Sequence, residues 1–137
     1  MDRERTMTGA TGVKTILVVD DDDSTVEFLA QLLELEGYAV TTASNGQEAL
    51  ERASRNVPDL IVTDQMMPVM TGAEFFRALK KSARLGQVPV ILVTSAPPPA
   101  ASDLRWAELL RKPLDLEHLL QAVQRVFREG CERSALG

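Results

Sequence analysis

Short apolar runs alternate along the chain with longer amphipathic stretches. Three of these runs are wholly apolar and mostly β-branched, at 16–19, 60–62 and 90–93. Runs of this length and composition are typical of strands buried on both faces of a parallel sheet. Weaker patterns at 38–42 and 107–111 predict two further strands, the first of them more exposed.

The amphipathic stretches between the runs predict helices. Ser24 with Glu27 has the spacing of an N-terminal capping box, and Thr71 with Glu74 repeats it. Apolar residues at helical spacing follow each pair, which places one face of each helix toward a core. The remaining helix boundaries are predicted at Gly37 (end), Ser44 or Asn45 (start), Pro58 (end), Asp115 (start) and Gly130 (just past the end).

Strands that alternate with helices predict an α/β fold. We expect a doubly wound sheet of five parallel strands, with right-handed crossovers and helices on both faces. Residues 97–99 are Pro-Pro-Pro, which cannot lie inside a helix, so a fourth helix would follow them with only about two turns. A length of 137 residues suits one domain, predicted at 14–129 between tails at 1–13 and 130–137.

The composition narrows the class of protein. Hydrophobic residues make up 45% of the chain and aromatic residues only 4%, which predicts an aliphatic core. The net charge of −5 argues against direct nucleic-acid binding. Cys131 is the only cysteine, so no internal disulfide can form and a reduced, cytoplasmic setting is expected. No apolar run reaches the length of a membrane span, and no signal peptide is recognisable.

Charged and hydroxyl side chains follow the predicted strands, where an open α/β sheet binds its ligands. Asp20 and Asp21 follow the first strand, and Asp64 follows the third. Thr94 ends the fourth strand and Lys112 follows the fifth. Carboxylates without histidine or cysteine suit a hard cation, and Mg²⁺ fits best. A carboxylate can also attack phosphorus and form an aspartyl phosphate.

Four stretches together resemble the receiver domain of response regulators in two-component signalling, of the chemotaxis-receiver kind. They are Ile-Leu-Val-Val-Asp-Asp at 16–21, Asp-Gln-Met-Met-Pro-Val-Met-Thr-Gly at 64–72, Val-Ile-Leu-Val-Thr-Ser at 90–95, and Lys-Pro at 112–113. The similarity covers residues 14–127. It implies the flavodoxin-like strand order 2-1-3-4-5. Because it takes up almost the whole chain, we expect a stand-alone receiver in a phosphorelay.

The resemblance also implies roles for individual residues. Asp64 matches the phosphoacceptor, Thr94 the hydroxyl that contacts a phosphoryl oxygen, and Lys112 the lysine that pairs with the phosphoryl group. The bond between Lys112 and Pro113 is expected to be cis, as is typical of the family. In these terms the chain is no classical enzyme, because it would catalyse only its own phosphorylation and dephosphorylation.

The same resemblance implies a magnesium site. Asp21 and Asp64 would ligate Mg²⁺ directly, and Asp20 would do so through water. The backbone carbonyl of Met66 would be a further ligand. Met66 also stands where small phosphatases with an aspartyl nucleophile carry a second acid, which argues against that enzymatic alternative.

Partners follow from the implied role. A histidine kinase or a histidine phosphotransfer protein would donate the phosphate, and an unknown downstream protein would read the phosphorylated surface. No direct contact with nucleic acid and no membrane insertion are expected. The receiver is expected to be a monomer or a weak homodimer.

Two departures from the family pattern keep an alternative open. Leu109 stands where the family often has an aromatic switch residue, and only 18 positions separate Thr94 from Lys112 (112 − 94). The alternative is a pseudo-receiver that takes no phosphate and acts as an interaction module. Trp106 could be a satellite core residue or part of a contact surface, and both interpretations stand. Other polar side chains are interpreted as helix caps or solvated surface, namely Asp22, Asp23 and His118.

Overall fold

The computed structural model describes residues 12–95, 97, 101 and 103–136, the last six of these by their backbone alone. Strands and helices alternate, which confirms the predicted α/β class. The elements in chain order are β1 (Thr15–Val19), α1 (Asp23–Leu35), β2 (Ala39–Ala43), α2 (Gly46–Arg55), β3 (Leu60–Asp64), α3 (Gly72–Lys80), the 3₁₀ turn η3 (Leu85–Gln87), β4 (Val90–Thr94), β5 (Glu108–Arg111) and α4 (Leu116–Leu136).

The five strands form one parallel sheet in the order β2-β1-β3-β4-β5, which confirms the predicted strand order. The three apolar runs are the central strands, and β3 and β4 are buried along their whole length. In the register, Val19 pairs with Thr63, and Asp64 pairs with Val93. The carboxyl ends of the central strands therefore meet at one edge.

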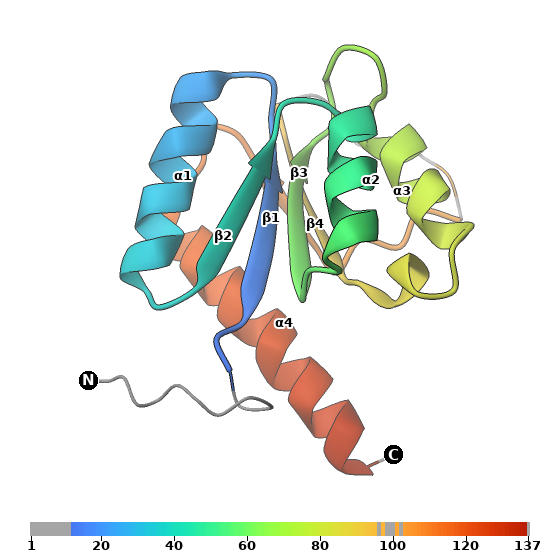
Figure 1. The fold of residues 1–137 in the computed structure, drawn as a ribbon. Coiled ribbons are helices and arrows are strands. Elements are labelled where there is room, and N and C mark those ends of the chain that lie inside the picture. Colours follow the sequence, from blue (N-terminus) through green and yellow to red (C-terminus); the bar gives the residue numbers. More distant parts are fainter. Residues whose placement is uncertain (1–11, 96, 98–100, 102, 137) are drawn as a thin grey trace.

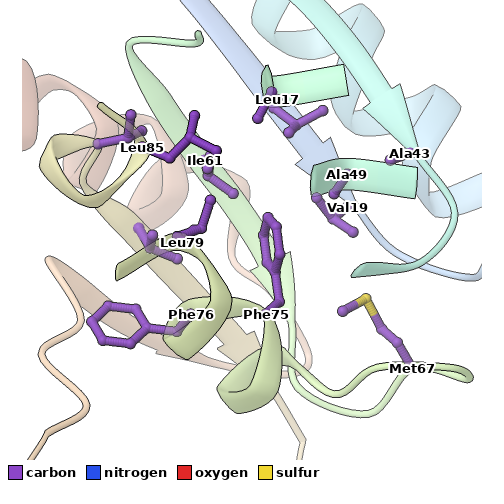
Figure 2. Close-up of a cluster of buried hydrophobic side chains, with 13 residues drawn as sticks. Leu17, Val19, Ala43, Ala49, Ile61, Met67, Phe75, Phe76, Leu79 and Leu85 are labelled. Carbon is purple, nitrogen blue, oxygen red and sulfur yellow. The ribbon is translucent and has the colours of Figure 1, made fainter. Parts of the chain in front are cut away.

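Helices cover both faces of the sheet, α2 and α3 on one side and α1 and α4 on the other (Figure 1). An apolar cluster lies on each face of the sheet. Because side chains alternate along a strand, Leu17 and Val19 join the cluster on the α2–α3 side, while Ile16 and Val18 join the cluster on the α1–α4 side. Phe75 and its neighbours fill the α2–α3 side (Figure 2). Both clusters are mainly aliphatic, as the scarcity of aromatic residues predicts.

The helix boundaries confirm most of the predicted caps. Thr71 and Glu74 form the expected capping box, Asn45 caps α2, and the Asp115 carboxylate accepts from the N–H groups that begin α4. The capping box predicted at Ser24 is wrong. The Asp22 carboxylate accepts from the N–H groups of Ser24 and Thr25 instead, which confirms the interpretation of Asp22 as a cap.

The connection from β4 to β5 differs from the predicted pattern. Its described residues (95, 97, 101 and 103–107) contain no helix, so the expected short fourth helix is absent from them. Pro97 is exposed, and Pro98 and Pro99 lie outside the described residues. Trp106 packs instead on Phe76 of α3, with 4.9 Å between ring centroids. This contact makes Trp106 a satellite core residue.

The last helix is longer than its sequence pattern predicts. The predicted end just before Gly130 is wrong, because α4 continues through Gly130 to Leu136. Its C-terminal part runs beyond the lower edge of the sheet in the view of Figure 1. Among the described residues, no helix is long and apolar enough to cross a membrane.

Two glycines of opposite backbone geometry test this account of the helix ends. Gly37 has φ +101°, which disfavours a side chain, whereas Gly130 is helical, and an added Cβ would meet nothing within 4 Å at either position. Gly37→Ala should lower the free energy of unfolding by about 1 kcal/mol or more. Gly130→Ala should raise it by about 0.5–1 kcal/mol. Urea unfolding measures both, and changes of the same sign would contradict the assignment.

Candidate functional site

Three carboxylates meet at the carboxyl edge of the sheet because β1 and β3 are neighbours. Asp20 follows β1 directly, and Asp64 is the last residue of β3. Their side chains are buried, with residue exposures of only 5% and 8%, whereas Asp21 is exposed. One carboxylate oxygen from each of the three lies within 4.8 Å of the others. The structure thus brings together the acidic residues that the sequence predicted.

Lys112 reaches this cluster from the end of β5. Its Nζ lies 3.5 Å from Oδ2 of Asp20 and 3.4 Å from Oδ2 of Asp64. The Lys112 backbone N–H donates to the carbonyl of Thr94 at 3.0 Å, which holds the lysine beside β4. The peptide bond to Pro113 is cis, as expected. One ammonium group therefore lies between two buried carboxylates.

The charges at this edge do not balance. Burial raises the pKa of Asp20, although the N–H of Asp22 and the Lys112 ammonium oppose that effect. Partial burial lowers the pKa of Lys112, but Asp20 and Asp64 outweigh it, so the pKa of Lys112 lies above its ordinary value. Three carboxylates face one ammonium, and this excess of negative charge suits a divalent cation. The donor set of oxygens alone fits Mg²⁺.

The turn from β3 to α3 holds Asp64 from the other side. The N–H of Gln65 donates to Oδ1 of Asp64 at 2.8 Å. The backbone and side-chain oxygens of Gln65 accept from Gly72 and Ala73, both at 2.9 Å. A Cβ at Gly72 would lie only 2.6 Å from the Asp64 carbonyl, so this close approach requires glycine. Sequence reasoning did not single out Gln65, because a glutamine after a strand has no distinctive pattern.

The other predicted site residues lie on the same edge. Thr94 is fully buried at the end of β4, the strand beside β3. Met66 is 60% exposed as a whole residue in the turn after Asp64. A cavity of about 200 Å³ lies at this edge, and its lining includes Asp20, Asp64 and Lys112 together with apolar side chains of the sheet. The roles of these residues in binding and catalysis stay predictions.

Two residues discussed from the sequence lie away from the carboxylate cluster. Leu109 is half-buried in β5, opposite Leu92 of β4. His118 is an exposed side chain near the start of α4, with its Nδ1 4.0 Å from Asp115. This position confirms the interpretation of His118 as a surface residue.

Fold and site together define a small α/β domain with an acidic, lysine-containing centre, and comparison with known proteins gives its class. Residues 16–124 match the model of the response regulator receiver domain. The chain therefore belongs to the response regulator receiver domain family, which two-component systems use.

Several relatives and solved structures are similar to this chain. Response regulator MprA of Mycobacterium sp. (strain KMS) is 36% identical over 130 residues, 88% of this chain and 56% of that protein. The chemotaxis response regulator CheY4 of Vibrio cholerae is 34% identical, with a TM-score of 0.76 over 83% of this chain and 98% of that chain.

A further similar structure is the receiver domain of the sensor histidine kinase PA1611 from Pseudomonas aeruginosa, solved with a magnesium ion in its active-site cleft. It is 25% identical, with a TM-score of 0.74, and the match covers 83% of this chain and 97% of that one. The first curated relatives are longer proteins, and this chain spans between a third and about half of their length.

The crowding of charge predicts the effect of removing one carboxylate. Because burial disfavours ionised Asp20, metal-free Asp20→Asn should be more stable than wild type at neutral pH. The pKa of Asp20 is raised on folding, so its ionisation costs stability above that pKa and costs nothing below the unfolded value of 3.8. The difference in the free energy of unfolding between Asp20→Asn and wild type should therefore vanish as the pH falls from above the folded-state pKa of Asp20 to below 3.8. Unfolding in chelator at several pH values measures it, with exposed Asp23→Asn as the control.

Proposed function

We propose that this receiver accepts a phosphoryl group on Asp64 from the phosphohistidine of a histidine kinase or a histidine phosphotransfer protein. The convergence of Asp20, Asp21 and Lys112 on the Asp64 carboxylate is the observation that supports this proposal. Phosphoryl transfer needs mainly positioning and neutralisation of charge, and these neighbours are of the types that supply both.

In the proposed reaction a carboxylate oxygen of Asp64 attacks phosphorus. The new oxygen–phosphorus bond forms as the bond from phosphorus to the donor's imidazole nitrogen breaks, and the imidazole leaves with that electron pair. The Lys112 ammonium, 3.4 Å from Oδ2 of Asp64, would pair with the transferred group. The Thr94 hydroxyl would donate to a phosphoryl oxygen. The acyl phosphate then biases the domain between two conformations that partners distinguish.

We also propose that Mg²⁺ is the cofactor of this reaction. Asp20, Asp21, Asp64 and the backbone carbonyl of Met66 would hold the ion, the first of them through water. When bound, it would neutralise negative charge on the phosphoryl oxygens. The cluster of three carboxylates within 4.8 Å supports this assignment. The relative with magnesium in its cleft supports it as well.

The output of this receiver would be a change in protein–protein contacts with a downstream protein, in the cytoplasm. That it works without an attached output domain stays a prediction. A pseudo-receiver that takes no phosphate is the second candidate. Leu109 at the usual switch position and the absence of a helix from the described part of the β4–β5 connection favour that alternative. The complete set of charged residues around Asp64 favours phosphorylation.

Phosphorylation by a small donor separates these two candidates. Incubation with acetyl phosphate and Mg²⁺ should add the mass of one phosphoryl group to the wild-type protein. Asp64→Asn should add none, because the nucleophile is lost. Asp59→Asn, at the opposite end of β3, should behave as wild type. Intact-protein mass spectrometry reads each sample, and an unmodified wild type would support the pseudo-receiver.

Binding of Mg²⁺ is expected to stabilise the folded state. At a free Mg²⁺ concentration about tenfold above the dissociation constant, the free energy of unfolding should rise by about 1.4 kcal/mol. Asp21→Asn should lose most of this increase because one ligand becomes a neutral amide. Asp23→Asn changes the same group two positions away, outside the cluster, and should keep it. An equal loss in both variants would contradict the proposed ligand set.

A further inference from the structure

We propose that Gln65 is a positioning residue for the reaction at Asp64, an inference that rests on the proposed function of that carboxylate. Gln65 follows the phosphoacceptor directly and makes hydrogen bonds in two directions. Through its N–H it holds the Asp64 carboxylate. Through its two carbonyl oxygens it holds the first turn of α3.

The bond to Asp64 fixes one carboxylate oxygen. The N–H of Gln65 donates to Oδ1 at 2.8 Å, while Oδ2 lies 3.4 Å from Nζ of Lys112. The two oxygens therefore have different partners, and rotation of the carboxylate would break both contacts. Its orientation depends on the peptide group that carries this N–H.

That peptide group is tied to α3. The backbone oxygen of Gln65 accepts from Gly72, and its Oε1 accepts from Ala73, both at 2.9 Å. These are consecutive N–H groups at the start of a helix, where no partner exists within the helix itself. The side chain thus adds a second anchor, one residue further along α3 than the backbone bond.

The helix on the other side of this connection is held by the core, because its buried face is packed there. Phe75, Phe76 and Leu79 are each 2% exposed or less. Gly72 approaches so closely that a Cβ there would lie 3.0 Å from both Cα and Oε1 of Gln65. Little space is left for the Gln65 peptide to shift, so the rigidity of α3 is passed to the Asp64 carboxylate.

The capping box of the same helix offers a matched comparison. Thr71 Oγ1 accepts from Glu74 at 3.2 Å, and so completes the first turn of α3 without a hydrogen bond to Asp64. Loss of the Thr71 hydrogen bond or of the Gln65 side-chain hydrogen bond should destabilise the first turn of α3. Only loss of the Gln65 bond should loosen the carboxylate, and this difference separates positioning from a merely structural role.

The experiment compares Gln65→Leu, Gln65→Glu and Thr71→Ala in the full chain, each first shown to be folded by urea unfolding. The rate of phosphorylation by acetyl phosphate at saturating Mg²⁺ is one readout. Gln65→Leu removes the acceptor and should lower this rate about tenfold. Gln65→Glu keeps an oxygen for Ala73 and should restore it to within about threefold of wild type. Thr71→Ala should keep the wild-type rate.

The dissociation constant for Mg²⁺, followed by amide chemical shifts, is the second readout and needs no phosphorylation. It should rise about tenfold in Gln65→Leu and stay unchanged in Thr71→Ala. If wild type takes no phosphate, the proposed function fails and this second readout alone decides on Gln65. Gln65→Leu at wild-type values, Gln65→Glu as impaired as Gln65→Leu, or an equal effect of Thr71→Ala would each overturn the inference. So would a wild type that binds no Mg²⁺.

Discussion

Two like charges held side by side with little access to water are the constraint on which this structure depends. Asp20 directly follows β1 and Asp64 ends the adjacent parallel strand β3, so the sheet itself sets their separation. Burial of carboxylates is costly unless opposite charges and hydrogen bonds compensate for it. Lys112 lies within 3.5 Å of both side chains, and backbone N–H groups of Asp22 and Gln65 donate to them. These contacts offset the repulsion only in part, which leaves the site receptive to a cation.

Such an arrangement needs a rigid support, and the two apolar layers supply it. The central strands have no polar side chain along their middle, so both faces pack against helices. The polar groups are confined to the strand ends, where backbone groups and the next loop can reach them. Thr63 shows this transition, since its hydroxyl is buried and donates to the carbonyl of Asp64 at 3.0 Å. The apolar core and the charged edge are therefore consecutive parts of the same strands.

The elements that the sequence predicts well are those with strong local patterns. The apolar runs locate β1, β3 and β4, and parallel topology then brings Asp20, Asp64 and Lys112 to one edge. Errors arise where several local signals compete. Asp22 precedes Ser24 and caps α1, because a carboxylate also interacts favourably with the helix dipole. Gly130 does not end α4, because a glycine costs a helix only about 1 kcal/mol and helix-forming neighbours can exceed that.

Gln65 and Trp106 could not be placed from the sequence for a different reason. Both residues lie outside the regular helices and strands, and no periodic pattern encodes their contacts. Gln65 binds Ala73 across the turn, while Trp106 packs on Phe76 across thirty positions (106 − 76).

Both contacts are made with α3. Arg77 of this helix also forms an ion pair with Asp103 of the β4–β5 connection, at 2.7 Å. In the described part of that connection, Trp106 and Asp103 thus both contact α3 directly. The same helix begins against the backbone of Asp64, so one helix borders both the charged site and the β4–β5 connection.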